Sequence, residues 1–562
     1  MRLAILFLLL VVCANAGILD SLGAKIKGIF TGENGLGARL KKALNVTCLV
    51  KVQEKFKKIK KKMKKALELT PAMLQSLKER LKKLRPIKKD KFQENGDSIT
   101  EINEKSGIGD YLYQGDMALS ETQAEEVIEG IEEEVNGTSR PKRQAFRDKW
   151  YTRRLWSEGV NYYIDPNASE KMRTVFVKAA KQWNDLTCID FKESDRTGDK
   201  LYVFQETGCW SNVGRRGGKQ SLSLGQGCES VGVALHELGH TLGFFHTMSR
   251  HDRDDYITIN SENVKDDWHG EFTKETERTN YNYGLDYDYG SVMHYGIHAG
   301  SRNKKPTMVP MDINHQETIG SEMLSFVDIS MMNDHYGCKE RCDPRRSAQC
   351  ENGGFPHPRR CSECICPGGY GGRTCTERPR GCGDIMDATS NWARLEDTLG
   401  HGTKSRDDFE KCNYWITSPE NTQIQVRIVS FTKGLAVDGC YFAGVEIKTN
   451  EDHTLTGYRF CAPEDAGVTL TSYSNLVPII TYNRAFPTET ILEFRYVRNQ
   501  RPPTQRPKPK LTTTTPRPTT KSNSCVDHRE CPKLVDLGFC DDKDRPEAIK
   551  EKMCPRSCGF CD

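Results

Sequence analysis

Four side chains in one short stretch have the types and spacing needed to hold a metal ion and activate water. His236 and His240 stand four residues apart, so on a helix they share one face and can bind the same ion. Glu237 lies between them and can act as a general base. Gly243 lets the helix end and the chain turn, which brings His246 round as a third nitrogen ligand. Three protein ligands leave one position open, as a catalytic zinc requires.

A second motif, Ser291-Val292-Met293-His294-Tyr295, follows downstream. Its methionine fits a turn that underlies the metal, although plain core packing would also explain Met293. In the order S-x-M-H-Y the motif resembles the astacin family of zinc metalloendopeptidases. The resemblance implies that Tyr295 approaches the zinc as an extra ligand, then swings away and donates a hydrogen bond to the oxyanion. An ordinary half-buried aromatic is the alternative for this tyrosine.

The resemblance extends over residues 144–338. Residues 209–228 look like the family's cysteine loop with the strand after it, an edge strand expected to pair with an extended substrate backbone. Residues 250–254 and 319–338 also fit. The resemblance implies an α+β metzincin domain with a mixed sheet and an active-site helix, binding one Zn²⁺. We therefore expect an endopeptidase that hydrolyses extracellular proteins, with matrix or cuticle components as possible substrates. The rival is a catalytically silent adhesive or binding protein.

The N-terminus predicts secretion. Met1-Arg2 precedes the apolar run from Leu3 to Val12, and Ala14-Asn15-Ala16 is a small-x-small cleavage site, so residues 1–16 are expected to be a signal peptide. A membrane anchor needs about 20 apolar residues, and neither this run nor any later one is long enough. We expect an extracellular protein with no transmembrane segment. The net charge of +5 over 562 residues does not indicate a nucleic-acid partner.

The chain has 22 cysteines in regular clusters, which indicates disulfides formed in an oxidising compartment. Cys13 lies in the signal peptide and Cys48 in the pro-region, and the others divide among four modules without remainder. The family resemblance implies that Cys188 pairs with Cys338 and Cys209 with Cys228. The other cysteines expected in disulfides are Cys342, Cys350, Cys361, Cys364, Cys366, Cys375, Cys382, Cys412, Cys440, Cys461, Cys525, Cys531, Cys540, Cys554, Cys558 and Cys561.

Three modules are expected after the protease. Residues 339–376 have EGF-like cysteine spacing, which favours pairing 1–3, 2–4 and 5–6, although fifteen pairings are possible. Residues 382–498 alternate β-prone runs with turns and resemble a CUB β-sandwich, but Ala443 replaces the calcium-binding aspartate of many such domains. A Pro/Thr-rich linker over 499–524 leads to residues 525–561, which resemble the small, disulfide-rich, helical ShK module.

Residues 17–143 are expected to be a pro-region. Apolar residues at helical spacing among many lysines predict one or two amphipathic helices, which pack on the protease or bind a membrane surface. The region ends at Arg140-Pro141-Lys142-Arg143, a site of the type cut by furin-like proteases. The acidic run from Glu121 to Glu134 just before it is consistent with an exposed, flexible stretch.

Tyr113-Gln114-Gly115-Asp116-Met117 resembles the latency motif of astacin pro-regions. The carboxylate of Asp116 can replace the catalytic water on zinc, and Gly115 permits close backbone approach. The alternatives are a solvated loop aspartate at position 116, or Cys48 as the latency ligand.

Glycosylation sequons begin at Asn45, Asn136 and Asn167. One position departs from the family. Most members have a glutamate after the third histidine, which binds the new N-terminal ammonium, but here the residue is Thr247. The first mature residue would be Gln144, which can cyclise and lose its ammonium. The sequence therefore suggests that this salt bridge is absent, so that Thr247→Glu would barely alter activity or stability.

Overall fold

The computed structural model describes residues 46–135, 145–146, 151–276 and 279–498, and single positions between 531 and 560. The chain divides into two compact units, residues 1–499 and 500–562. The predicted sites at Asn45, Asn136 and Arg143, and the residues Gln144, Cys525 and Cys561, lie outside the described residues. Asn167 is described and exposed, as a glycosylated asparagine must be.

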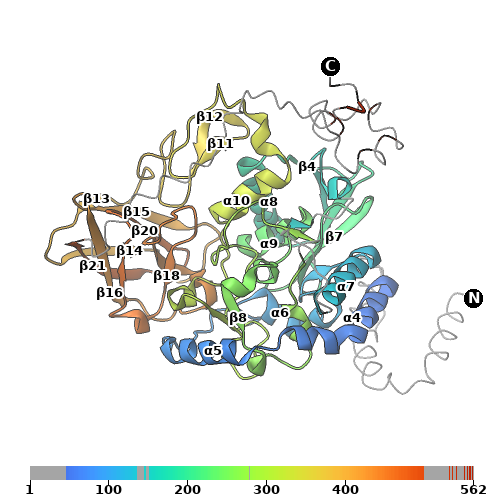
Figure 1. Cartoon of the computed structure of the whole chain (residues 1–562), viewed down its shortest axis with the longest axis horizontal. Coiled ribbons are helices and arrows are strands. Elements are labelled where there is room, and N and C mark those ends of the chain that lie inside the picture. The colour runs from blue at the N-terminus through green and yellow to red at the C-terminus, as the bar shows by residue number, and fades with distance from the viewer. Residues whose placement is uncertain are drawn as a thin grey trace, which may run out of the picture. The chain divides into compact units, whose positions relative to one another are not determined.

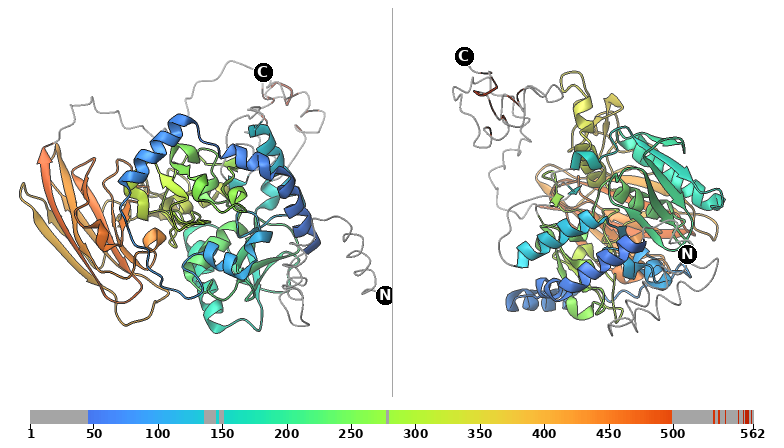
Figure 2. Two further views of the ribbon diagram at one scale, coloured as in Figure 1. Left: turned by 90° about the horizontal axis from the view of Figure 1, so that it is seen from below. Right: turned by 90° about the vertical axis from the view of Figure 1, so that its right-hand side faces the viewer.

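The elements of the first unit appear in Figures 1 and 2. The α-helices are α4 Val46–Ala66, α5 Pro71–Lys83, α6 Ile99–Ser106, α7 Glu121–Val135, α8 Glu170–Leu186, α9 Val231–Thr241 and α10 Phe326–His335. The 3-10 turns are η1 Gly109–Tyr111, η2 Tyr151–Arg154, η3 Thr247–Ser249, η4 Arg253–Asp255, η5 Ser261–Asn263, η6 His269–Phe272, η7 Ile313–Glu317, η8 Cys338–Arg341, η9 Asp438–Cys440 and η10 Pro463–Asp465.

The strands up to β10 are β1 Met117–Ala118, β2 Ala145–Phe146, β3 Val160–Ile164, β4 Phe191–Glu193, β5 Lys200–Phe204, β6 Cys209–Asn212, β7 Lys219–Leu224, β8 Ile257–Ile259, β9 Asn280–Tyr281 and β10 Met308–Pro310. The later strands are β11 Phe355–His357, β12 Arg360–Ile365, β13 Ile385–Asp387, β14 Ala393–Leu399, β15 Glu410–Thr417, β16 Thr422–Phe431, β17 Ala443–Ile447, β18 Tyr458–Phe460, β19 Thr469–Thr471, β20 Leu476–Asn483 and β21 Thr488–Arg498.

A six-stranded mixed sheet and two long helices form the protease domain, which confirms the expected α+β fold. The strand order is β1-β6-β7-β5-β3-β4, and within it β6 runs antiparallel to β7 while the other neighbours are parallel. Helix α8 packs on α9, and α9 in turn contacts β6 and β7. Every residue of α9 is buried, because this helix crosses the centre of the hydrophobic core.

The strand β1, at one edge of this sheet, comes from residues 17–143, the predicted pro-region. Met117 and Ala118 lie opposite Ser211 and Asn212 of β6 and run parallel to them. The strand after the cysteine loop was expected to be the edge strand that pairs with substrate. That strand, β7, lies inside the sheet between β6 and β5, and β6 is the strand next to β1. Residues 117–118, from the predicted pro-region, occupy the outer side of β6.

The pro-region helices confirm one prediction and overturn another. Helix α4 is amphipathic as expected, and it buries Val52, Ile59 and Met63 against the rest of the unit. The acidic run, however, is a helix and not a flexible stretch. Helix α7 packs along α4 because Ala124, Val127 and Ile131 form a buried face, and its glutamates pair with lysines of α4.

Downstream of the protease, disulfides and sheets define two further modules. The first is held by three bonds, Cys342–Cys361, Cys350–Cys364 and Cys366–Cys375, which is the EGF-like order. The second, here called the β-sandwich (residues 385–498), has a five-stranded sheet facing a four-stranded sheet across an apolar core. Its disulfides are Cys382–Cys412 and Cys440–Cys461.

In the second unit the structure forms Cys531–Cys554 and Cys540–Cys558. Among the helices that the structure describes, none combines the length and apolar character that a membrane span requires.

Candidate active site

Helix α9 presents two of the three histidines, and the sequence explains its placement. The Ser230 side chain caps the helix by accepting from the Val233 backbone N–H at 3.1 Å. Gly239 faces the methionine of the downstream turn, since a Cβ at this position would lie 2.5 Å from Met293 Sδ. The methionine is 1% exposed, so it packs directly beneath the helix that carries His236 and His240.

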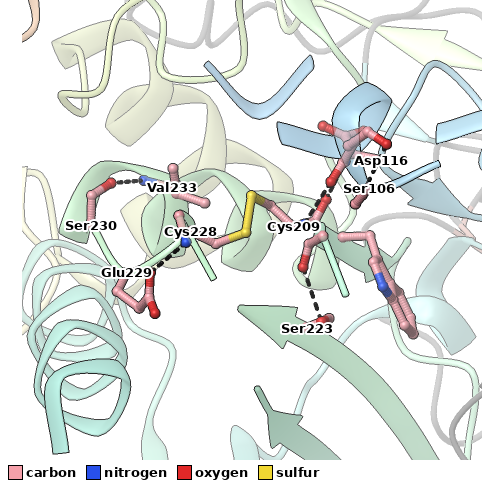
Figure 3. The surroundings of a disulfide bond; sticks show 12 residues. Ser106, Asp116, Cys209, Ser223, Cys228, Glu229, Ser230 and Val233 are labelled. Atoms are coloured by element: carbon pink, nitrogen blue, oxygen red, sulfur yellow. Dashed lines mark hydrogen bonds between the residues drawn. A yellow bond between two sulfur atoms is a disulfide. The ribbon is translucent and has the colours of Figure 1, made fainter. Parts of the chain in front are cut away.

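A disulfide fixes the start of α9 to the edge of the sheet. Cys209 of β6 is bonded to Cys228, two residues before the cap Ser230, and Figure 3 shows this bond together with the Ser230–Val233 hydrogen bond and Asp116. The second expected bond of the domain, Cys188–Cys338, joins the end of α8 to the segment after α10. Strand β6 and the start of helix α9, which carries His236 and His240, are therefore joined covalently.

The chain turns sharply after α9 to bring in the third histidine. Gly243 has φ +113°, a conformation that other residues rarely adopt. The Nε2 atom of His236 then lies 3.1 Å from that of His240 and 3.3 Å from that of His246. The three ring nitrogens thus converge on one point, as the sequence predicted.

The opposite nitrogen of each ring is held by a carbonyl oxygen. Nδ1 of His236 lies 2.7 Å from the Val292 carbonyl, and Nδ1 of His240 lies 2.7 Å from the Phe244 carbonyl. Nδ1 of His246 lies 2.9 Å from the side-chain oxygen of Gln114. Because Nδ1–H donates in each case, Nε2 is left with its lone pair toward the common point.

The carboxylate of Asp116 occupies the middle of this cluster. Its Oδ2 lies 3.0 Å from Nε2 of His236 and 3.1 Å from Nε2 of His246, and its Oδ1 lies 3.3 Å from Nε2 of His240. All four side chains are buried. Asp116, the residue predicted from sequence as the latency ligand, therefore lies against all three histidines.

The residues fit a zinc ion. One ligand atom from each of Asp116, His236, His240 and His246 lies within 4.8 Å of the others. Burial lowers the pKa of His240, and it lowers the pKa of His246 to about 3, so both imidazoles are neutral donors at pH 7. Neutral imidazoles and a carboxylate are zinc ligands.

Glu237 faces the same interior. Both of its carboxylate oxygens are buried, and neither has a hydrogen-bond partner among the described residues. Burial, followed by the charge of Asp116, raises the pKa of Glu237 well above its usual value. Buried carboxylate oxygens normally have a hydrogen-bond partner, so these two favour the binding of a polar group beside the histidine cluster. A general base needs this arrangement, because it must contact the water that it deprotonates.

Tyr295 also reaches the cluster. Its hydroxyl lies 2.6 Å from Asp116 Oδ2 and 2.8 Å from the Gln114 carbonyl oxygen. Burial and then the charge of Asp116 raise the pKa of this tyrosine well above its usual value, so the phenol stays protonated and can donate.

Replacing Tyr295 by phenylalanine is expected to lower kcat of the processed enzyme about 10²-fold and to change KM little, because an oxyanion donor acts only in the transition state. Steady-state kinetics on a short peptide measure both constants. Tyr289→Phe is the control, since its hydroxyl donates to the Tyr256 carbonyl away from the cluster. Equal kcat values for Tyr295→Phe and the control would show that Tyr295 is only a packed aromatic.

Two residues of the predicted pro-region belong to the site although no role was predicted for either: Gln114 lies within the latency motif, and Asn103 lies outside any motif. Gln114, besides holding His246, lies near the Tyr113 hydroxyl at 3.1 Å. The Asn103 side chain donates to the carbonyls of Gly115 and Cys209 and accepts from the Cys209 N–H. It therefore fastens the latency turn to β6. No local pattern marks an asparagine within a helix for such a role.

The reason for Gly115 differs from the one expected. A Cβ there would lie 3.5 Å from the Tyr295 hydroxyl and 3.6 Å from Trp268, which are ordinary contacts. Its φ of +86°, however, is in the region that favours glycine. The glycine is needed for the turn that aims Asp116, and not for a close approach.

The residues around Thr247 lead us to expect a loss of stability when it is replaced by glutamate. Thr247 is 3% exposed, and its hydroxyl donates to Ser291 Oγ at 2.8 Å. The Ser291 hydroxyl in turn donates to Asp328 at 2.5 Å. Burial raises the pKa of Asp328 to about 6, so this pocket already disfavours the ionised form of one carboxyl group.

We therefore expect Thr247→Glu to lower the free energy of unfolding by about 2–5 kcal/mol, because a second carboxyl enters the buried pocket of Asp328, where the neighbouring Arg250 is already paired with Asp252. Thr247→Ser keeps the hydroxyl and should be close to wild type. Calorimetric unfolding of the processed protein tests both variants. A silent Thr247→Glu would instead support the view taken from sequence alone.

Three histidines around one point, a buried glutamate and a tyrosine donor define a zinc peptidase. Comparisons with known proteins agree. The model of the Astacin peptidase family matches residues 148–337, and the ShK domain-like model matches residues 524–561.

Relatives identify the family. Zinc metalloproteinase nas-31 of Caenorhabditis elegans is 45% identical over 486 residues, which cover 86% of this chain and 77% of the relative. Zinc metalloproteinase nas-32 of the same nematode is 37% identical over 454 residues, with coverages of 79% and 67%. The chain therefore belongs to the astacin family of zinc metalloendopeptidases, with a ShK-like module at its end.

A solved structure was also matched. High choriolytic enzyme 1, a hatching enzyme zinc-protease from the medaka Oryzias latipes, is 33% identical, with a TM-score of 0.31. The match covers 34% of this chain and 94% of that one.

Proposed function

We propose that this chain is a secreted zymogen of a zinc endopeptidase, silenced by Asp116 and activated by cleavage after Arg143. The observation that carries the proposal is the position of Asp116, a residue upstream of the dibasic site, against all three histidines and Tyr295. The cluster cannot serve as an active site while this carboxylate fills it. Furin-like proteases fit the basic sequence that ends at Arg143.

The ion itself has a defined place. His236, His240 and His246 would hold zinc in the mature enzyme, and the bound ion supplies Lewis-acid polarisation and lowers the pKa of water to about 7.

The chain's own residues carry the proton chemistry. Glu237 takes a proton from the attacking water and passes it to the leaving amine. The Tyr295 hydroxyl donates to the oxyanion. The edge of β6 is positioned to pair with an extended substrate once β1 leaves it. This complete set argues against a silent adhesive protein.

Extracellular proteins are the proposed substrates, including components of matrix or cuticle. Secretion is supported by the expected signal peptide and by the many disulfides of the first unit.

Metal removal tests the proposed function directly. Treating the processed protein with 1,10-phenanthroline should abolish hydrolysis of a quenched fluorescent peptide, and one equivalent of Zn²⁺ should restore it. Metal analysis before and after treatment gives the stoichiometry. Undiminished hydrolysis after complete loss of zinc would refute the assignment.

A further inference from the structure

The pro-region segment between α5 and α6, residues 84–98, lies along the junction of the protease domain and the β-sandwich (Figure 2, left). We call this stretch the junction segment. Arg85 near its start inserts between the two modules. Its Nε lies 2.6 Å from Oδ1 of Asp465 in the β-sandwich, and its NH2 nitrogen lies 3.2 Å from Oε2 of Glu317 in the protease.

The two carboxylates that contact Arg85, those of Asp465 and Glu317, are buried and held in place. The side chain of Asp465 is fully buried and that of Glu317 is 6% exposed. The second oxygen of Asp465 accepts from the Ala462 N–H at 3.0 Å, which fixes the carboxylate in place. Burial and the neighbouring Asp465 raise the pKa of Glu317 well above its usual value, so in the uncut chain the Arg85 guanidinium is the counter-charge of the Asp465 carboxylate and also contacts Glu317.

The junction segment lies in a groove between the protease domain and the β-sandwich, and this groove also binds the main chain of the segment. The side-chain amide of Gln316 both donates to the Arg85 carbonyl and accepts from the Arg85 N–H, each at 2.9 Å. Further along, the Asp90 N–H donates to the Ala436 carbonyl at 2.8 Å, and the Ala436 N–H donates to the Asp90 side chain at 3.0 Å. Three of these four contacts use only main-chain atoms of the segment, so they can bind an extended chain of other sequence.

An aromatic contact completes the junction. Phe92, seven positions after Arg85, has its ring centroid 3.8 Å from that of Phe442 and 6.3 Å from that of Phe486. Beyond it the Tyr441 hydroxyl donates to the Asp97 carbonyl. The segment is thus held by a guanidinium pocket at one end and an aromatic pocket at the other.

A small pocket borders both the end of the junction segment and the catalytic site. This pocket is lined by Asp97 and Ser98 of the junction segment, by His236 and Tyr295 of the site, and by Asp438 and Tyr441 of the β-sandwich. A chain lying in the groove is therefore led toward the histidine cluster, as the pro-region itself is on its way to Asp116.

We propose that the processed enzyme uses this junction as an exosite for protein substrates. It would bind an extended segment that carries an arginine and, seven residues later, an aromatic side chain. The inference rests on the proposed function, because the junction segment must first leave with the pro-region. Its departure would leave the Asp465 carboxylate without its counter-charge, and a substrate guanidinium restores it.

A labelled peptide of residues 84–98 is the probe. We expect it to bind the processed full chain, freed of its pro-region, and not the uncut chain, whose groove is filled. Arg85→Ala or Phe92→Ala in the peptide should weaken binding at least about tenfold. Lys91→Ala is the matched control, because Lys91 is exposed and its removal costs the same charge as loss of Arg85. Fluorescence anisotropy measures all four peptides.

Equal affinities of the Arg85→Ala and Lys91→Ala peptides would overturn the proposal, as would binding to the uncut chain. So would co-elution of the cleaved pro-region with the enzyme at micromolar concentration, since the groove would then remain closed. These readouts do not require catalysis, so they fail independently of the proposed peptidase activity.

A competition assay addresses substrates. Unlabelled peptide should slow hydrolysis of fluorescent casein several-fold and leave hydrolysis of a six-residue peptide unchanged. Inhibition of both would place the peptide in the catalytic cleft, and inhibition of neither would separate the groove from substrate binding. Either result overturns the exosite.

Discussion

Replacing Glu237 by glutamine is expected to lower kcat/KM of the processed enzyme by about 10²–10⁴-fold while zinc remains bound. The structure gives the reason, since both carboxylate oxygens are buried beside the histidines and have no other partner among the described residues. Glutamine keeps the shape of the side chain but cannot take a proton. The loss corresponds to about 3–5 kcal/mol in the activation free energy.

Peptide kinetics and metal analysis on the same preparation measure this effect. Glu262→Gln is a suitable control, because that glutamate is exposed and its side chain lies in the η5 turn, away from the cluster. Activity of Glu237→Gln within a few-fold of wild type would remove the general base from the mechanism. Loss of activity together with loss of zinc would show a structural role instead.

Replacing Asp116 by alanine should make the uncut chain active. The carboxylate contacts three imidazoles and the Tyr295 hydroxyl, and a hydrogen bond to a charged group contributes about 1.5–3 kcal/mol. Loss of one such hydrogen bond should raise the population of the active conformer about 10- to 100-fold. Activity should still stay below that of the processed enzyme, because β1 continues to cover the edge of β6.

The measurement is hydrolysis of a short peptide by chains shown to be intact by mass spectrometry. Glu94→Ala is the control, since Glu94 is an exposed acid of the same pro-region. If uncut wild type, Asp116→Ala and Glu94→Ala were equally silent, latency would have to come from the rest of the pro-region. Cys48, the other latency candidate, is tested by Cys48→Ser in the same assay.

The parts of the site that sequence could predict are those encoded by short spacing. The i, i+4 histidines, the glycine turn before His246 and the tyrosine after the methionine follow from local geometry. Asp116 was found because its motif is also local. Three-dimensional partners were not predictable, because Asn103 reaches Cys209 and Arg85 reaches Asp465 across long stretches of sequence.

The wrong prediction for the acidic stretch has the same origin. The glutamates from 121 to 134 suggested a flexible stretch because their charge concealed the buried face of α7, and that face has meaning only against α4. For Thr247→Glu the sequence predicts a silent change and the structure a destabilising one, because the sequence does not show that Ser291 links Thr247 to Asp328. Element types follow from local patterns, whereas tolerance to mutation depends on the tertiary neighbours of each residue.

The short strand β1 has a consequence for how the enzyme is switched on. While Asp116 and β1 belong to the same polypeptide as the histidines, the effective concentration of this inhibitor is of millimolar order and does not depend on the protein's own concentration. Once the chain is cut, the pro-region becomes a separate ligand that obeys mass action. Dilution into the extracellular space would then complete the activation that cleavage begins.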